Sequence, residues 1–562
     1  MKYANWNVPG HGAEIPRALL AAGCTPLLAA ILHLRGLSDP AAARSFLRGG
    51  AETLTNPLEL TGMVDAVQRL TRAVATGEHV AVYGDYDVDG ITAACLLTDY
   101  LRFRGLTCEL KIPDRIRDGY GLNTAAIDAL AEEGVTLIVT VDCGVTNLEE
   151  TAYAAQRGVD MIVTDHHECR EALPEAEAVV DPKQPDSSGV GTALAGVGVA
   201  FKLVCAMDGD ADKMLARYGD LVAVGTVADV MPLLGENRFI TRCGLQKIAA
   251  GDCRPGFLAL AEEAGVRDKP FTASTVGFSL APRINAAGRL GEPSLAVRLL
   301  EETDLRRARV LAAELCAKNR ERQALETEIW REAVERLHGE QPNAPIVLAS
   351  EGWHPGVIGI VASRLTDAYS VPAVMICLDG ESGKGSCRST GSFNLFEALS
   401  ACSDCLEGFG GHAMAAGVTV RRGCVDELRS RLREYYLSHP DRTLPALEAD
   451  LLVDSPELLT MACVESLDEL EPCGNGNPRP LLYMENVSLD SVQPIGGGKH
   501  LRLKLAKFGQ TYDGVFFSQT APALGARAGQ RCDIVFAPQI NEFHSRRSVQ
   551  LVITDLRRSK EG

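Results

Sequence analysis

The sequence lacks an apolar segment long enough to cross a membrane, because charged residues such as Lys202 and Asp229 interrupt its longest apolar stretches. The first residues also lack the apolar core of a secretory signal peptide. Internal repeats and low-complexity tracts are absent, which excludes a repeat architecture. These absences predict a protein with neither an export signal nor a membrane span.

Paired cysteine motifs are scarce. The 17 cysteines stand mostly singly within apolar runs, as Cys95 and Cys377 do, and such thiols behave as small buried hydrophobes. One Cys-x-x-Cys motif, Cys402 to Cys405, is present, but a structural zinc site needs a second pair at suitable spacing. The pattern therefore predicts free thiols, no zinc site and a cytoplasmic location.

Positive charge is in deficit over the whole chain, whose net charge is −18. This balance argues against a protein that coats DNA by bulk electrostatics. The deficit is uneven, however, because the segment from Ser491 to the C-terminus contains 11 Lys and Arg against five Asp and Glu. The C-terminal segment is thus the basic part of an acidic protein, and local contact with nucleic acid stays open.

The length of 562 residues predicts several domains, and 46% hydrophobic with 23% charged residues is typical of a soluble globular protein. Between about residues 78 and 230, β-rich runs alternate with helical patterns, which indicates β-α-β units around a parallel sheet. Four runs are predicted strands that each lead to acidic residues: Val80–Tyr83, Val135–Val141, Met161–Thr164 and Leu221–Ala228.

The rest of the chain predicts three further parts. Residues 304–338 have helical spacing and few breakers, which indicates a long connecting helix. A second α/β unit follows, with strands at Pro345–Leu348 and Ala373–Cys377 and with loops at Gly383–Thr390 and Gly408–Gly417. After Pro440, four short alternating segments predict a small barrel: His500–Leu505, Asp513–Phe517, Cys532–Phe536 and Val549–Thr554.

The most informative motif places Asp85, Asp87 and Asp89 at a two-residue period directly after the apolar run 80–82. An extended backbone would point all three carboxylates the same way. Like charges this close repel and raise one another's pKa unless a cation or several donors lie among them. A site for a hard divalent cation explains the motif best.

The other three predicted strands add Asp142, the sequence Asp165-His166-His167, and Asp229. Ligands of open α/β sheets collect outside the carboxyl ends of the strands, so we expect these side chains to converge. Oxygen and imidazole ligands without thiolate suit Mn²⁺ or Mg²⁺. Two such ions can activate a water for phosphoester hydrolysis. The alternative for each acid alone is a helix or turn cap.

The order of the motifs resembles the DHH phosphoesterase superfamily. Asp87-Val88-Asp89 is similar to its first motif, Asp142-Cys143-Gly144 to the second, Asp165–His167 to the third and Gly225–Leu233 to the fourth. The resemblance implies that Asp87, Asp89, Asp142, His166 and Asp229 hold metal and that His167 holds metal or phosphate. Some members carry a His where this chain has Tyr83, and Asp85 would compensate as a further catalytic residue.

Within the superfamily the sequence is most similar to RecJ-type exonucleases, which degrade single-stranded DNA from its 5′ end. The strings Ala281–Arg289, Gly352–Leu365, Gly385–Thr390 and Gly410–Gly417 carry this likeness. It implies substrate binding by Arg283, Asn285, Arg289, His354, Arg388, Ser389, Gly411 and His412. Arginine forks can grip phosphate, and glycines let backbone amides approach an anion. The structural alternatives are that the arginines form surface ion pairs, that His412 is a buried histidine, and that residues 353–356 are only a helix entry.

Six aromatic residues interleave with the basic residues of the C-terminal segment, a combination that suits base stacking: Phe508, Tyr512, Phe516, Phe517, Phe536 and Phe543. We expect half of them to be barrel core. By resemblance this region is an OB fold that helps to hold single-stranded DNA.

The predicted fold class is α/β multidomain. It comprises an N-terminal helical segment (1–55), a parallel-sheet DHH catalytic domain (56–303), a connector helix (304–342), a DHHA1-type substrate-binding domain (343–442) and an OB-fold barrel (443–562).

The predicted function is 5′ to 3′ exonucleolytic hydrolysis of single-stranded DNA to mononucleotides in recombination and repair, with two Mn²⁺ or Mg²⁺ ions. A single-strand-binding protein and a RecQ-type helicase are partners implied by the resemblance. The alternatives are a DHH phosphoesterase for small substrates (oligoribonucleotides, a cyclic-dinucleotide product or polyphosphate) and a non-catalytic nucleic-acid-binding scaffold.

Overall fold

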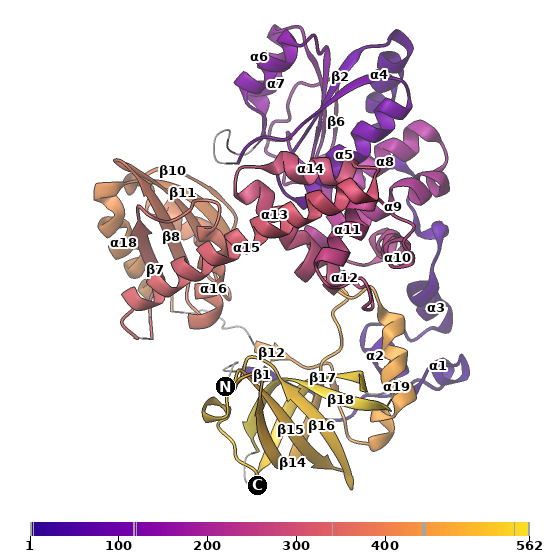
Figure 1. Ribbon diagram of the computed structural model, residues 1–562, viewed down its shortest axis with the longest axis vertical. Helices are drawn as coiled ribbons and strands as arrows, with labels where there is room; N and C mark the ends of the chain where they lie inside the picture. The colour runs from indigo at the N-terminus through magenta and orange to yellow at the C-terminus, as the bar shows by residue number, and fades with distance from the viewer. Residues whose placement is uncertain are drawn as a thin grey trace. The chain divides into compact units, whose positions relative to one another are not determined.

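The computed structural model describes residues 3, 5–115, 119, 121–339, 341–440, 446–543 and 546–559. The predicted boundary between residues 442 and 443 and the basic residue Lys560 lie outside them. The chain forms two compact units (Figure 1). The core unit comprises Ala51–Arg442 with Pro472–Gly476, and the barrel unit comprises Met1–Gly50, Thr443–Glu471 and Asn477–Gly562.

A five-stranded parallel sheet with the order β3-β2-β4-β5-β6 organises the first half of the core unit. Its strands are β2 (His79–Gly84), β3 (Thr107–Lys111), β4 (Leu137–Val141), β5 (Asp160–Thr164) and β6 (Ala178–Val180). Alternate residues of β2 enter two different hydrophobic clusters, because successive side chains of a strand point to opposite faces. The predicted parallel sheet is confirmed, including strands at three of the four predicted runs.

Helices cover both faces of this sheet. Helices α4 (Met63–Thr76), α5 (Val88–Phe103) and α8 (Gly196–Asp208) share one hydrophobic cluster with it. Helices α6 (Thr124–Glu132) and α7 (Leu148–Gln156) contribute to the cluster on the other face. Burial on both faces is the usual environment of a parallel sheet.

The fourth predicted strand, Leu221–Ala228, is wrong. These residues form the second half of helix α9 (Ala211–Ala228), which packs against α5, α8 and α10 (Gly235–Ala250). All residues from Tyr218 to Thr226 are buried, so no polar face reveals a helical period. Asp229 consequently follows a helix end rather than a strand end.

Helix α15 (Leu305–Arg336) joins the two halves of the core unit (Figure 1). It begins at Asp304, whose side chain accepts a hydrogen bond from Arg307 N. Its first half packs with α11 (Pro255–Glu263), α13 (Ala281–Arg289) and α14 (Pro293–Glu301), between which lie α12 (Ala273–Thr275) and a π-helix (Val276–Leu280). Ile329 and Ala333 near its end enter the second core. The predicted connecting helix is confirmed.

The second half of the core unit contains a five-stranded sheet with the order β10-β11-β9-β8-β7. Its strands are β7 (Ile346–Ser350), β8 (Ala373–Asp379), β9 (Ser382–Arg388), β10 (Leu406–Gly411) and β11 (Ala415–Arg421), and its helices are α16 (Ile358–Tyr369), α17 (Leu395–Ser400) and α18 (Val425–Ser438). Strands β7 and β8 are parallel, and the other pairs are antiparallel.

The two loops predicted in this half are wrong, because most of their residues lie in β9, β10 and β11. Glycine is disfavoured in strands, so the sequence predicts loops there. In the structure the glycines allow close contact. A Cβ on Gly385 would lie 2.6 Å from the Val418 side chain, and one on Gly383 would lie 2.7 Å from Ile376.

The barrel unit contains the strand order β13-β14-β15-β16-β18-β17, which closes because β14 also pairs with β17. The strands are β13 (Leu451–Leu452), β14 (Leu482–Ile495), β15 (His500–Lys507), β16 (Gln510–Phe516), β17 (Arg531–Phe543) and β18 (Arg546–Arg558). The predicted small barrel is confirmed, with strands at all four predicted segments. The sequence did not predict β14.

The N-terminal residues pack in the barrel unit rather than in the core unit. Strand β1 (Asn5–Asn7) pairs with β12 (Ala446–Glu448), and Trp6 Nε1 donates a hydrogen bond to Asp555 Oδ2 at 3.0 Å. Helices α1 (Arg17–Ala21), α2 (Pro26–Leu34) and α3 (Pro40–Arg48) follow, and α19 (Met461–Ser466) belongs to the same unit. Among the described residues, none of the helices is long and apolar enough to span a membrane.

The close crossing of α9 and α10 predicts a position that tolerates no side chain. A Cβ on Gly244 would lie 2.1 Å from the carbonyl oxygen of Gly219 and 2.4 Å from Ala223 Cβ. We expect Gly244→Ala to lower the free energy of unfolding by about 1–3 kcal/mol, measured by denaturant titration. Gly277→Ala is the control, because its Cβ would meet only Val227, at 4.0 Å. Equal stability of the two variants would contradict the prediction.

Candidate metal centre

The aspartate motif lies where β2 ends and α5 begins. Asp87 caps α5, because its Oδ1 accepts a hydrogen bond from Gly90 N at 3.1 Å, and Asp89 lies in the first helical turn. The predicted extended backbone through Asp89 is therefore wrong. The turn still brings the acids to one place, since Asp85 and Asp87 can offer oxygens together with Asp142.

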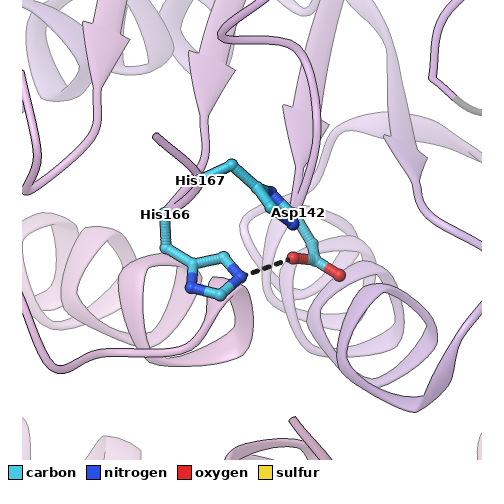
Figure 2. Close-up of side chains that lie close together, drawn as sticks. All are labelled: Asp142, His166 and His167. Atoms are coloured by element: carbon cyan, nitrogen blue, oxygen red, sulfur yellow. Dashed lines mark ion pairs between the residues drawn. The ribbon is translucent and has the colours of Figure 1, made fainter. Parts of the chain in front are cut away.

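His166 lies among three carboxylates that come from different elements. Its Nε2 is 3.1 Å from Asp142 Oδ1, 3.6 Å from Asp229 Oδ2 and 3.8 Å from Asp89 Oδ2. Figure 2 shows Asp142 facing His166, with His167 beside them. The structure thus brings the expected ligands together, although Asp229 arrives from the end of helix α9.

The backbone around Asp142 is unusual. Asp142 has a φ of 60°, in the left-handed region that non-glycine residues rarely adopt. Helix α8 approaches so closely that a Cβ on Gly196 would lie 2.5 Å from Asp142 Cβ. Strained residues of this kind collect at functional sites. The left-handed turn and the neighbouring glycine together place the Asp142 carboxylate next to His166.

Backbone amides hold two of the acids. Asp89 accepts hydrogen bonds from Gly196 N at 2.6 Å and Val197 N at 2.9 Å, in the first turn of α8, where the helix dipole favours negative charge. Asp165 accepts from Val145 N at 3.0 Å and lies 2.7 Å from His167 Nδ1. Asp165 therefore orients His167, a positioning role that the sequence motif does not reveal.

Burial and mutual repulsion raise the pKa of most of these carboxyls. The pKa values of Asp89 and Asp142 lie well above their usual range, first because of burial and then because of neighbouring aspartates. Burial and the charge of Asp87 raise the pKa of Asp85 to about 8 and that of Asp229 to about 7. The cluster cannot hold all its negative charges at neutral pH without a cation.

The pKa values of the two histidines shift in opposite directions. Burial and the neighbouring His167 lower the pKa of His166 to about 4, so its ring is neutral and has a free lone pair. Burial also opposes the charge of His167, but its hydrogen bond to Asp165 outweighs this and raises the pKa of His167 to about 9. Burial alone would raise the pKa of Asp165, yet the same bond and charge lower it. His166 is suited to a metal, and His167 to an anion.

Several polar atoms of the cluster lack a partner. Within the described part of the chain, Asp85 Oδ1, Asp142 Oδ1 and both ring nitrogens of His166 are buried and make no hydrogen bond. Such atoms are rare in proteins and require an explanation. The ligand atoms form three overlapping groups, and within each group they lie within 4.8 Å of one another. None of these groups includes a cysteine sulfur. The donor set therefore fits hard divalent cations such as Mn²⁺ and Mg²⁺.

A groove of about 1160 Å³ adjoins the cluster. Tyr86, Asp87 and His167 line it on the side of the first sheet, and β8, β9, β10 and β11 line it on the other. Of the residues predicted to bind substrate, Arg388 and Gly411 line the groove. A groove of this volume can hold a ligand larger than a single phosphate group.

The sequence did not single out three other groove residues, Tyr86, Arg115 and Lys384. The guanidinium carbon of Arg115 lies 4.9 Å from the centre of the Tyr86 ring, which is cation–π geometry. Arg115 lies outside every motif, so no signal in a single sequence identifies it. Tyr86 stands between two of the motif aspartates, and this position is the one sequence feature that could identify it as a groove residue.

Uncompensated positive charge gathers in this region. Burial and the charges of Arg115, Arg322 and Arg388 lower the pKa of Arg289 to about 10. Burial also lowers the pKa of Arg388. Neither Arg289 nor Arg388 pairs with a carboxylate among the described residues, whereas Arg322 pairs with Glu326 at 2.8 Å. These arginines are therefore suited to bind a negatively charged ligand.

The other predicted substrate-binding residues do not line the groove. Arg283 bonds to Ser279 O and to Cys316 Sγ, and the Ser389 hydroxyl donates to Phe393 O. His412 is exposed in the turn between β10 and β11. Asn285 is half-buried on α13, and His354 Nδ1 accepts a hydrogen bond from Gly356 N. Their roles stay predictions.

Trp353 belongs to the second hydrophobic core. It is buried, and its Nε1 donates to Glu332 Oε2 at 2.7 Å. The structural interpretation of the 353–356 segment, a helix entry before α16, therefore holds for Trp353.

Family models match three parts of the chain: the DHH family N-terminal domain at residues 79–226, the DHHA1 domain at 331–437 and the RecJ OB domain at 450–555. The single-stranded-DNA-specific exonuclease RecJ of Bacillus subtilis is 40% identical, over 94% of this chain and 68% of that protein. The RecJ of Dickeya dadantii is 36% identical over 98% of both chains.

Solved structures agree with these matches. The crystal structure of Thermus thermophilus RecJ with Mn²⁺ has a TM-score of 0.84 and 31% identity, and covers 99% of this chain and 80% of that one. The structure of the same protein with Mg²⁺ has a TM-score of 0.79 and 30% identity, over 99% of this chain and 79% of that one. Both ions that suit the donor set are thus bound in crystal structures of one relative with the same fold.

The pKa shifts predict how the stability of the metal-free protein depends on pH. Asp229, Asp85 and His167 have folded-state pKa values of about 7, 8 and 9, above their unfolded values. Each binds its proton more tightly when folded, so each stabilises the fold at low pH and loses this contribution as pH rises. The lowered pKa of His166 acts in the opposite direction, but only below about pH 6.5.

We therefore expect the melting temperature in EDTA to fall between about pH 6.5 and pH 9. Mn²⁺ should restore it at the upper end by replacing the protons. Asp142→Asn should flatten the curve, since it removes one of the repelling charges. A wild-type melting temperature that rises over this range would contradict the assignment.

Proposed function

The chain belongs to the RecJ family of single-stranded-DNA-specific exonucleases, and we propose that it hydrolyses the phosphodiester at the 5′ end of a single strand beside His166. One observation carries the proposal: His166 Nε2 lies within 3.8 Å of three carboxylates, beside a groove whose arginines pair with no carboxylate of the described residues. This arrangement joins a cation site to a phosphate site.

Divalent cations held there would polarise the scissile phosphate and lower the pKa of the attacking water. We propose two ions, Mn²⁺ or Mg²⁺, because the ligand atoms form overlapping groups on both sides of Asp142. Asp89, Asp229 and His166 would hold one ion, and Asp85 and Asp87 the other. Asp142 is grouped with His166 and His167 and also with Asp85 and Asp87, so it would contribute to both sites.

His167 would act on the substrate. It lines the groove, and its Nδ1 lies 2.7 Å from Asp165 Oδ1, which orients the ring. With its raised pKa it carries a proton at neutral pH in the metal-free protein. His167 would donate a hydrogen bond to a phosphate oxygen, an interaction that stabilises charge developing in the transition state.

The groove would hold the strand by its phosphates. Arg388 and Arg115 supply forked donors, and Lys384 adds a further charge. Arg289 does not line the groove, but it lies close enough for the charges of Arg115 and Arg388 to lower its pKa. Six glycines line the groove, which leaves backbone accessible to the strand: Gly356, Gly383, Gly385, Gly410, Gly411 and Gly417. Forked donors and bare backbone recognise phosphates without regard to base sequence.

The barrel would assist by stacking bases. Tyr512, Phe516 and Phe536 are buried in the barrel, as expected for half of the aromatic residues. Phe517 is 54% exposed and packs edge-on against His500. Phe508 lies beside Lys507 Nζ, and the side chain of Phe543 lies outside the described residues. Phe517 and Phe508 are therefore the candidates for base stacking.

The remaining expectations stay predictions: release of mononucleotides, a role in recombination and repair, the domain boundaries, a cytoplasmic location, and a single-strand-binding protein and RecQ-type helicase as partners. Neither a small-substrate phosphoesterase nor a non-catalytic scaffold is favoured by any feature of the described residues.

Polarity is tested with single-stranded DNA labelled at its 5′ or its 3′ end and incubated with Mn²⁺ or EDTA. We expect mononucleotide label to appear first from the 5′ end in Mn²⁺ and no release in EDTA. Asp142→Asn should lower the rate at least a hundredfold, because Asp142 belongs to two of the three ligand groups and the amide carries no charge. Early release from the 3′ end, or an unaffected variant, would refute the proposal.

Arg388 provides a separate test of the phosphate site. A charge-assisted hydrogen bond contributes about 1.5–3 kcal/mol, so Arg388→Ala should raise KM for single-stranded DNA by about 10- to 100-fold. Arg388→Lys should recover only part of this, since lysine cannot form a fork. The exposed Arg306 on α15 is the matched control. Equal KM values for the Ala variants at 388 and 306 would exclude this role.

A further inference from the structure

The loop that carries Asp229 contains a strained residue. This ligand loop, 229–234, connects α9 to α10. Val230 has a φ of 58° and is 64% exposed. A β-branched residue in the left-handed region is a genuine outlier and persists only where its surroundings enforce it. Relaxation of Val230 would move the residue next to it, Asp229, away from His166.

The enforcing contact comes from a distant part of the sequence. Pro472–Gly476 lies in the core unit, although the chain on both sides of it belongs to the barrel unit. Asn475 Nδ2 donates a hydrogen bond to Val230 O at 2.8 Å, and Asn475 O accepts one from Leu233 N at 2.8 Å. One residue therefore holds the ligand loop at two points.

The contact is closely fitted. A Cβ on Gly474 would lie 2.7 Å from Leu233 Cδ1, and Gly476 adopts a φ of 71° in the turn after Asn475. The buried Arg238 donates from Nη1 to Pro472 O at 3.1 Å. From helix α10, Asn237 Nδ2 donates to Pro232 O at 3.1 Å. The loop is thus held by both α10 and the segment Pro472–Gly476.

We propose that Asn475 is a positioning residue of the metal centre. It holds Val230 in its left-handed conformation and so fixes the Asp229 carboxylate beside His166. The free energies of one hydrogen bond and of one strained residue are of the same order and opposite sign, so loss of the amide lets the loop relax. This inference rests on the proposed role of Asp229 as a metal ligand. A segment that follows both α/β domains in sequence thereby completes the site.

The test is direct Mn²⁺ binding without DNA, measured by electron paramagnetic resonance of free Mn²⁺ on the full chain. We expect Asn475→Ala to raise the dissociation constant of the ion that Asp229 holds about tenfold, or about 1.4 kcal/mol. Asn343→Ala is the matched control, since this exposed asparagine lies in a bend remote in sequence from every ligand, and it should bind Mn²⁺ as the wild type does. A merely structural Asn475 would change the melting temperature of the metal-free protein and leave Mn²⁺ affinity unaltered.

Val230→Gly tests whether backbone strain at Val230 causes the loss of Mn²⁺ affinity, because glycine adopts a positive φ at little cost. In the Asn475→Ala background it should restore most of the Mn²⁺ affinity, and failure to do so would overturn the mechanism. Asp229→Asn separates the positioning role of Asn475 from the ligand role of Asp229. If it weakens binding and Asn475→Ala does not, the positioning role is wrong. If Asp229→Asn itself has no effect, the ligand set of the proposed function is wrong.

Discussion

Repulsion between buried carboxylates is the interaction on which the rest of this structure depends. Asp85, Asp89, Asp142 and Asp229 all have raised pKa values, and burial is the largest cause in each case. A fold gains nothing from such a cluster by itself, because unpartnered buried charge is among the most destabilising features of a protein. The cluster makes sense as a cation site that the fold keeps assembled at a cost in stability.

Several local features serve to keep it assembled. The first turn of α8 donates two amides to Asp89, and Asp142 is held in the left-handed region against Gly196. Asp165 takes no place in the predicted ligand set but orients His167. These devices resemble the outer hydrogen bonds that orient ligands in metal sites generally. The metal centre is thus specified by backbone geometry as much as by the identity of its acids.

The parallel sheet follows from the sequence for a physical reason, and the residues expected as ligands lie close together. Short buried strands that end in acids have a strong pattern, and Asp87, Asp142 and His166 lie near one another at the ends of such strands. The run before Asp229 is a helix and not the predicted strand, because a helix buried on all sides resembles a buried strand. Asp229 still reached the site, since the residue after either element can project into it.

Other features of the fold and of the groove cannot be predicted from a single sequence. The glycines of β9 to β11 favour loops, and only the close packing of Val418 and Ile376 explains why they form strands. Arg115 joins the groove through tertiary structure alone. Conversely, Arg283 and Ser389 lie in suggestive motifs, but their side chains bond within the protein. Motifs identified the chemistry, whereas the assignment of individual donors needed the fold.

If cations complete the carboxylate cluster around His166, anomalous scattering from Mn²⁺ in crystals of the protein should locate them. We expect two peaks, both within coordinating distance of Asp142, one also near Asp89, Asp229 and His166 and the other near Asp85 and Asp87. Full Mn²⁺-dependent activity in solution together with peaks only elsewhere in the crystal would contradict this expectation.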